Sequence, residues 1–111
     1  MADRSNRAIE RIFDALGDPT RRRILEHLSS GPRAVSSLSG PLKLTVAAIL
    51  QHVQCLERSG LVRTAKVGRV RTCEIESKAL ADAERWLADR RARWEENYDK
   101  LAALLGDEDG A

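Results

Sequence analysis

The feature that most constrains the fold is a helical pattern at residues 43–59 that runs directly into a short basic hairpin pattern at residues 61–75. The helical part repeats large apolar side chains at the i, i+4 and i+7 spacing of a single helix face. These side chains are Ile49, Val53 and Leu56. Thr45 can accept from the free amides of the first turn, and Gly60 can adopt the left-handed conformation that ends a helix. One face of this helix is therefore expected in the core.

The opposite side of the same helix is small, amide-bearing or basic. It carries Ala47, Ala48, Gln51, Gln54 and Arg58. No acidic residue occurs between Lys43 and Glu57, so this surface can lie against a polyanion.

The hairpin is indicated by two β-branched runs that flank Val67-Gly68-Arg69, where Gly68 supplies a permissive turn residue. Cationic side chains occupy both arms and the tip. They are Arg63, Lys66, Arg69 and Arg71. A helix of major-groove width followed by a short cationic hairpin is typical of a winged helix-turn-helix. The alternative is that the hairpin is a solvated sheet edge protected by charge.

The charge distribution singles out the same region, although the net charge of the chain is only +2. Residues 43–73 carry six basic and one acidic side chain, which gives +5. Residues 1–42 carry seven basic and five acidic side chains, +2, and residues 74–111 carry six and eleven, −5. The positive field is thus concentrated on the predicted helix and hairpin, which favours a nucleic-acid partner.

Two helical patterns open the chain. Residues 5–16 place apolar side chains on one helix face. The next helix, residues 18–29, begins with Asp18 as N-cap and Pro19 at the first helical position, where a missing amide costs nothing. The arginines at 21–23 are interpreted as mainly solvated or ion-paired, with one of them available to a phosphate.

A shorter helical pattern follows at residues 34–39, and Gly40-Pro41 is expected to turn the chain into the helix at residues 43–59. A short helix, a tight turn and a second helix have the spacing of a helix-turn-helix. The second helix of this pair is the one expected to enter a DNA groove.

The last helix, residues 77–105, is expected to be about 43 Å long at 1.5 Å per residue, more than the diameter of a small domain. Apolar and aromatic side chains recur along it every seven residues, so a monomer would expose a long apolar stripe. We expect a second copy of the chain to cover it, joined also through the first helix. The predicted interface consists of Ile9, Phe13, Trp86, Leu87, Trp94, Tyr98, Leu101 and Leu105. The alternative is that this helix folds back on its own core.

Chain length predicts one domain, residues 1–105, followed by an acidic disordered tail at residues 106–111. The chain has neither an apolar run of about 20 residues, which a bilayer span requires, nor an apolar signal segment. We therefore expect a cytoplasmic protein without a membrane partner. Two cysteines fit reduced thiols in that compartment better than a structural bridge.

Three local motifs accompany this order of elements. They are Phe13-Asp-Ala-Leu-Gly-Asp-Pro-Thr-Arg21 with Arg23-Ile-Leu-Glu-His-Leu28, the stretch from Thr45 to Val62 with its internal His52-Val53 and Leu56-Glu57, and Gly68-Arg69. Together they resemble the ArsR-type winged-helix repressors over residues 8–105. The resemblance implies a homodimeric DNA-binding transcriptional regulator, usually a repressor that an effector releases.

The sequence departs from that family in two respects. The exposed side of the predicted recognition helix carries the apolar residues Val46, Ala47, Ala48 and Leu50. Contacts with thymine methyls therefore gain importance, and base contacts are carried over only at Thr45, Gln51 and Gln54. Neither of the family's metal sites can form, since residues 35–38 lack a cysteine pair and the final helix lacks histidine. We expect no metal and no other cofactor.

Cys55 and Cys73 give a finer, alternative hypothesis. The resemblance places the end of the recognition helix beside the hairpin, so the two sulfurs could approach each other. Their oxidation would then tie the helix to the hairpin and change DNA affinity. The competing interpretation is that both are small buried hydrophobes.

The main prediction is a mainly α protein with a small β-hairpin, a winged helix-turn-helix with long N- and C-terminal dimerisation helices. It binds double-stranded DNA as a homodimer and represses transcription from an inverted repeat; its effector is unidentified. The residues assigned to DNA are Lys43, Thr45, Ala47, Gln51, His52, Gln54, Arg63, Lys66, Arg69 and Arg71. A winged-helix module that binds protein instead of DNA is the alternative. An enzyme has little support, because the sequence shows no phosphate loop and no paired catalytic motif.

Overall fold

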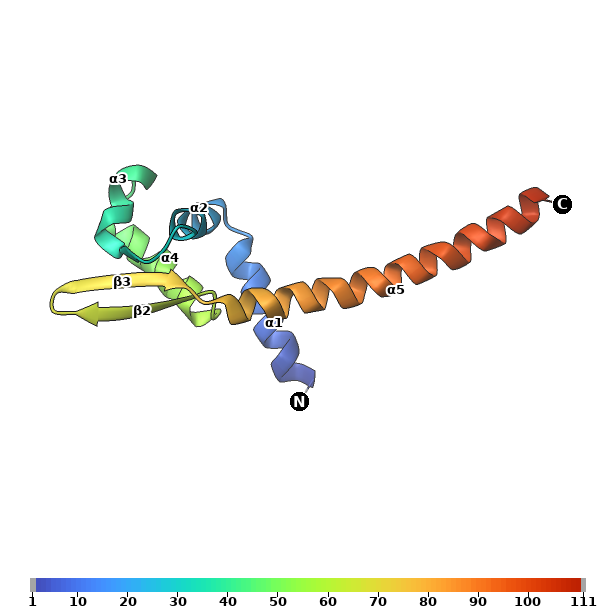
Figure 1. Ribbon diagram of the computed structural model, residues 1–111, viewed down its shortest axis with the longest axis horizontal. Coiled ribbons are helices and arrows are strands. Elements are labelled where there is room, and N and C mark those ends of the chain that lie inside the picture. Colours follow the sequence, from blue (N-terminus) through green and yellow to red (C-terminus); the bar gives the residue numbers. More distant parts are fainter. Residues whose placement is uncertain (1, 111) are drawn as a thin grey trace.

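The computed structural model describes residues 2–110, and side chains for residues 6–106. Helices and a small sheet alternate along the chain (Figure 1). In order they are α1 (Ala2–Leu16), α2 (Pro19–Leu28), β1 (Arg33–Ala34), the 3₁₀ turn η1 (Val35–Leu38), α3 (Ser39–Leu42), α4 (Val46–Arg58), β2 (Val62–Val67), β3 (Val70–Ile75) and α5 (Ser77–Gly110). This mainly helical architecture with a hairpin after α4 confirms the predicted fold class.

The first two helices form much as predicted. Asp18 caps α2, because its side chain accepts from the backbone N–H of Arg21 at 3.0 Å, and Pro19 occupies the first turn. α1 begins at Ala2, three residues earlier than expected, and Met1 lies outside the described residues.

The helix-turn-helix differs from the prediction in where its turn lies. Gly40 and Pro41 belong to the one-turn helix α3, so the expected turn at these residues is wrong. Proline is tolerated there because a first-turn amide has no partner within the helix. The chain instead reverses at Lys43, which has the left-handed angles φ 56° and ψ 44° and closes α3. α4 therefore starts at Val46 and not at Lys43.

A third strand, β1, was not expected. It pairs with β3 in antiparallel register, Arg33 opposite Cys73 and Ala34 opposite Thr72, to give the strand order β1-β3-β2. Two residues are too short to show the alternation that identifies a strand in sequence. The strand matters because it ties the segment before η1 to the hairpin.

The core lies where α1, α2, α4 and the base of the hairpin meet. The predicted apolar face of α4 is confirmed, since Ile49, Val53 and Leu56 are all completely buried. Other buried members include Ile12, Ala15, Ile24, Leu28, Leu38, Leu61 and Val62. Burial of this face fixes which side of α4 remains available to a ligand.

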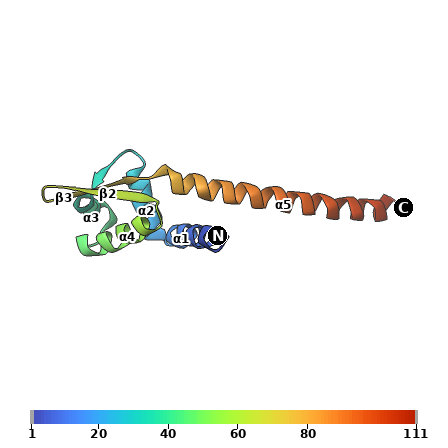
Figure 2. The same ribbon diagram turned by 90° about the horizontal axis from the view of Figure 1, so that it is seen from below.

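α5 leaves this core and projects from it (Figure 2), giving overall extents of 73 × 33 × 21 Å. The helix runs to Gly110, so the predicted end near Leu105 is wrong. Disorder of the tail at residues 106–111 stays a prediction. A glycine inside a helix costs only about 1 kcal/mol relative to alanine, and Gly106 does not take the left-handed conformation that would end the helix. Ala111 and the acidic side chains at 107–109 lie outside the described residues. Within residues 2–110, no helix combines the length and the apolar character needed to cross a membrane.

Candidate nucleic-acid interface

The recognition helix α4 is positioned by its cap and its buried stripe. The hydroxyl of Thr45 accepts from the backbone N–H of Ala48 at 3.1 Å, as predicted, and Gly60 follows the helix with φ +81°. With the apolar stripe turned inward, the opposite side is exposed. It presents Ala47, Gln51, Gln54 and Arg58. Gln51 and Gln54 are one helical turn apart and carry amides that can bond base edges.

Lys43, which lies two residues before the cap of this helix, is also exposed, and its left-handed backbone starts the turn that leads into α4. A helix N-terminus with free amides favours an anion, and an ammonium group two residues before the cap adds to that field. Lys43 is thus placed beside the start of α4, not within it.

The hairpin tip carries the cations that face no carboxylate. Gly68 has φ +63°, as expected of the predicted turn residue. The turn that joins Val67 to Val70 contains two residues, one fewer than the predicted Val67-Gly68-Arg69. Among the described side chains, Lys66, Arg69 and Arg71 form no ion pair. The β2–β3 register pairs Lys66 with Arg71, so their side chains share one face of the hairpin. They are therefore available for phosphates.

Arg63 is different, because it is engaged at the base of the hairpin. Its Nε donates to Glu74 Oε1 at 2.6 Å, and Nη1 lies 3.5 Å from Glu76 Oε2. The hydrogen bond to Glu74 and the charges of both carboxylates raise the pKa of Arg63. A phosphate contact by Arg63 would have to compete with these partners.

A second polar link joins the hairpin to α4. Arg71 Nη1 donates to Thr64 Oγ1 at 3.2 Å, and Thr64 Oγ1 donates to Glu57 Oε2 at 2.7 Å. Glu57 lies in the last turn of α4, so the chain of contacts fixes the hairpin relative to the recognition helix.

A groove of about 190 Å³ separates the start of α4 from the hairpin. Its lining consists of Val35, Ser36, Val46, Leu50, Arg69, Val70 and Arg71. Apolar walls with two guanidinium groups suit a sugar–phosphate backbone. The sequence did not indicate Ser36 or Val70, because their place in this groove depends on how the hairpin packs beside η1 and α4.

His52 does not share the exposed face of Gln51. Its Nδ1 is 4.0 Å from Asp18 Oδ2, and its side chain is 27% exposed. The structure therefore places His52 between α4 and α2, and its predicted contact with DNA gains no support from this position.

The two cysteines have different neighbours, and both are free. Cys73 is buried and its thiol donates to the carbonyl of Arg33 at 3.6 Å, whereas half-buried Cys55 borders a cavity of about 370 Å³ with Arg11, Asp14, Arg58 and Ser59. Burial raises the pKa of the Cys73 thiol, which lowers its thiolate fraction and its reactivity. Paired thiol sensing stays a prediction. Among the described residues, no group of three or more His, Cys, Asp or Glu side chains could hold a metal ion.

The residues predicted for dimerisation fall into two groups. Phe13 and Trp86 pack against each other within one chain, edge to face with ring centroids 5.3 Å apart, and Arg90 lies 4.5 Å over the Trp86 ring. Ile9 is also partly buried against the core. The rest are exposed along α5: Leu87 48%, Trp94 61%, Tyr98 71%, Leu101 53% and Leu105 51%. These five side chains, hereafter the α5 stripe, have no cover within the described part of the chain.

Comparison with known proteins assigns this fold to a family. Residues 18–64 match the family model for "Bacterial regulatory protein, arsR family". The chain is 36% identical over 75 residues to an HTH-type transcriptional regulator of Mycobacterium tuberculosis, which covers 68% of this chain and 70% of the relative. It is 24% identical over 76 residues to the transcriptional repressor SdpR of Bacillus subtilis, covering 68% of this chain and 84% of SdpR.

Comparison with solved structures leads to the same family. A crystal structure of an ArsR family transcriptional regulator superposes with a TM-score of 0.76 at 44% identity, covering 81% of this chain and 93% of that one. The homodimeric winged helix-turn-helix DNA-binding domain of a possible ArsR-family regulator from Mycobacterium bovis gives a TM-score of 0.60 at 25% identity, covering 84% and 83%. The relatives are named as regulators, which confirms the prediction that the chain is not an enzyme. The chain belongs to the ArsR family of bacterial transcriptional regulators, with a winged helix-turn-helix DNA-binding fold.

Proposed function

We propose that this regulator is a cytoplasmic homodimer that represses transcription by binding an inverted-repeat operator. The observation that carries the proposal is the pairing of an exposed amide-bearing face on α4 with the unpaired cations of the hairpin tip. Gln51 and Gln54 read bases in the major groove, while Lys66, Arg69 and Arg71 bind phosphates. The role of repressor is supported by the name of SdpR, a relative of this chain.

A second copy of the chain is the partner that the α5 stripe requires, and the Mycobacterium bovis relative is described as homodimeric. Charges along α5 favour an antiparallel pair about Trp94. Residues 84–93 contain four basic and two acidic side chains, +2, whereas residues 95–104 contain one basic and three acidic, −2. Antiparallel helices place these segments opposite each other and set Leu87 against Leu101, but parallel helices would oppose like charges.

Two reading units in a twofold dimer fit an inverted repeat. An antiparallel α5 pair about Trp94 sets the two Ser77 residues roughly 51 Å apart at 1.5 Å per residue, and α4 lies beyond the start of α5 (Figure 1). Half-sites about two turns of DNA apart, roughly 70 Å, therefore fit this dimer better than half-sites one turn apart. Arg69→Ala tests the phosphate role: affinity should fall to a similar degree on all duplexes. The slope of log K against log salt should decrease in magnitude by about 0.9 per subunit, because one phosphate contact is lost. Lys78→Ala, at the exposed start of α5, removes one positive charge outside the segments that favour the antiparallel pair and should leave the slope unchanged. Loss of sequence preference without a change in slope would contradict the assignment.

The same experiment distinguishes a DNA-binding regulator from the alternative, a winged-helix module that binds only protein. A module that binds only protein would show no salt-dependent binding of duplex DNA by the unmodified chain. A redox-responsive repressor would lose DNA affinity on oxidation, and Cys55→Ser would abolish that response.

A further inference from the structure

The connection between α1 and α2 is a hinge of only two residues, Gly17 and Asp18. α1 lies against α5 and carries Phe13, which packs on Trp86. α2 lies against α4, and α1 also contacts both α2 and α4. The hinge therefore joins the part of the molecule proposed to dimerise to the part proposed to read DNA. Whatever restrains it also restrains the position of α4 in a dimer.

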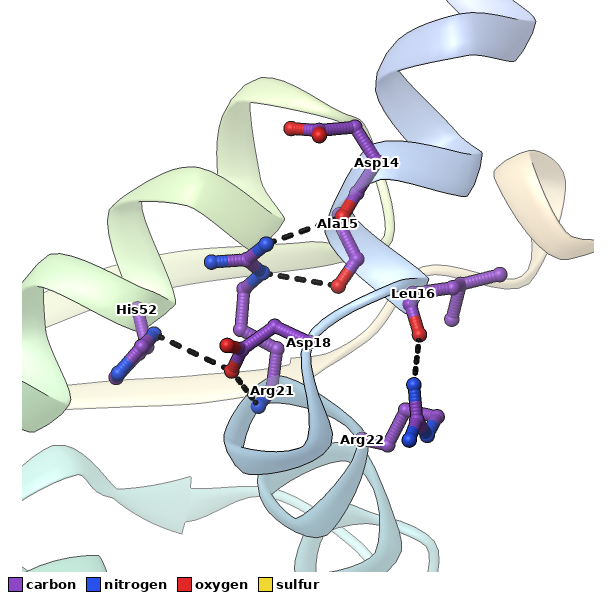
Figure 3. A network of polar contacts seen from close by, with 7 residues as sticks. All are labelled: Asp14, Ala15, Leu16, Asp18, Arg21, Arg22 and His52. Carbon is purple, nitrogen blue, oxygen red and sulfur yellow. Dashed lines mark hydrogen bonds and ion pairs between the residues drawn. The ribbon is translucent and has the colours of Figure 1, made fainter.

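Two arginines of α2 reach back across this hinge (Figure 3). Arg21 donates from Nε to the carbonyl of Ala15 at 2.9 Å and from Nη2 to the carbonyl of Asp14 at 3.0 Å. Arg22 donates from Nη1 to the carbonyl of Leu16 at 2.6 Å. These are last-turn carbonyls of α1, which form the negative end of its dipole; the Asp14 carbonyl also accepts from the backbone N–H of Gly17 at 3.1 Å. The guanidinium groups act as a clamp on the end of α1.

The same cluster continues to the recognition helix. The backbone N–H of Arg21 donates to Asp18 Oδ2 at 3.0 Å, and that oxygen lies 4.0 Å from Nδ1 of His52 on α4 (Figure 3). His52 directly follows Gln51, one of the proposed base-reading residues. Polar contacts thus run from the end of α1 through Arg21 and Asp18 to α4.

We propose that Arg21 is a positioning residue that locks the α1–α2 hinge and thereby sets the separation of the two recognition helices in the dimer. The inference rests on the proposed function, in which α1 and α5 dimerise and α4 reads DNA. Arg21 touches no DNA in this role; it acts through the angle between α1 and α4. The forked guanidinium is required because it bonds two successive carbonyls in one plane, which an ammonium group cannot reproduce.

The clamp can be removed without removing the core. Ile12 and Ala15 of α1 are 3% and 0% exposed and keep their apolar contacts in an Arg21→Ala variant. Arg21→Lys keeps the charge and loses the fork. Arg23→Ala is the matched control, because Arg23 is exposed and forms no hydrogen bond or ion pair among the described side chains.

The first measurement is the distance between nitroxide labels on the two α4 helices of the full-length dimer. The label is attached at Gln54→Cys in a Cys55→Ser parent, since Cys73 is 1% exposed and shielded from the reagent. We expect one narrow distance distribution in the parent and with Arg23→Ala, and a broadened or shifted one with Arg21→Ala and Arg21→Lys. A narrow, unshifted distribution with Arg21→Ala overturns the proposal. Absence of any distance between subunits in the parent overturns the proposed dimer and with it this role.

The second measurement uses duplexes selected from a random library by the unmodified protein. Affinity is compared for one half-site, for two half-sites at the selected spacing, and for two at altered spacing. Arg21→Ala should bind the single half-site normally, lose at least about tenfold for the correctly spaced pair, and discriminate less between spacings. Equal loss on single and paired half-sites would mean a purely structural role and overturns the proposal.

Discussion

Trp94→Ala removes the centre of the α5 stripe, so it should weaken the dimer strongly. Trp94 is 61% exposed. A tryptophan can bury up to about 250 Å², so roughly 150 Å² per subunit is available to a partner. At about 25 cal/mol per Å² this corresponds to about 4 kcal/mol per subunit. If a helix pair covers about half of that area, the two copies together contribute about 4 kcal/mol, or roughly a thousandfold in the dimer Kd.

The assay is sedimentation velocity over a concentration series, with circular dichroism to verify folding. Glu96→Ala is the control, because Glu96 lies on the opposite side of α5 and its exposed ion pair with Lys100, at 3.4 Å, is worth less than about 1 kcal/mol. It should leave the dimer Kd nearly unchanged. A folded Trp94→Ala protein whose dimer Kd stays within about threefold of the parent value would refute the reasoning, because the area argument requires about a thousandfold.

Three further predictions follow from local geometry. Thr45→Ala should reduce the free energy of unfolding in urea by about 1 kcal/mol through loss of the α4 cap, whereas Thr45→Ser should retain most of it. The backbone hydrogen bond from Arg21 is the main cause that lowers the pKa of Asp18 below its usual 3.8. A lowered carboxyl pKa stabilises the fold above the unfolded value, and that contribution is lost as pH falls through the folded value. The stability difference between the parent and Asp18→Asn should therefore shrink on going from neutral pH to about pH 3, and a constant difference would exclude this role. For the antiparallel α5 pair, Leu87→Cys and Leu101→Cys subunits should cross-link with each other when mixed in a Cys55→Ser parent, while Leu101→Cys alone should not; efficient Leu101–Leu101 cross-linking would indicate parallel helices.

The recognition helix could be predicted from sequence because its signals are local and agree with one another. The apolar spacing fixes the buried face of α4, and Thr45 and Gly60 mark its two ends. Consistent local preferences of this kind rarely mislead. The helical pattern was extended two residues too far, to Lys43 before the Thr45 cap, because a lysine in a left-handed conformation has no sequence signature, unlike a glycine.

The clamp at the α1–α2 hinge could not be predicted in the same way. Three consecutive arginines resemble a solvated cluster, and the acceptors of Arg21 and Arg22 are backbone carbonyls that every residue possesses. Only the direction of α1 relative to α2 shows that the last-turn carbonyls of α1 face the side chains of Arg21 and Arg22. The position of His52 depends in the same way on the packing of α4 against α2.

The partner of Arg63, by contrast, was within reach of sequence reasoning. A two-residue turn at Gly68 and Arg69 fixes the register, and counting outward from it sets Arg63 opposite Glu74. Opposite charges at paired positions attract, so the ion pair between Arg63 and Glu74 could have been predicted; the contact of Arg63 with phosphate stays a prediction. The positive charge of residues 43–73 is therefore not uniformly available.

The ion pair between Arg63 and Glu74 changes where affinity for DNA should reside. With Arg63 bonded to Glu74, the unpaired cations of the hairpin are Lys66, Arg69 and Arg71, all within three residues of the turn. The base of the hairpin then serves as a support: Thr64 bonds Glu57 of α4 and sets the distance between the hairpin tip and the recognition helix. Sequence-independent binding should depend on the tip, and base discrimination on the glutamines of α4. Breaking the Thr64–Glu57 hydrogen bond should leave phosphate binding by the hairpin tip and base contacts by α4 individually possible. It should mainly reduce the gain in affinity that arises when both bind the same DNA.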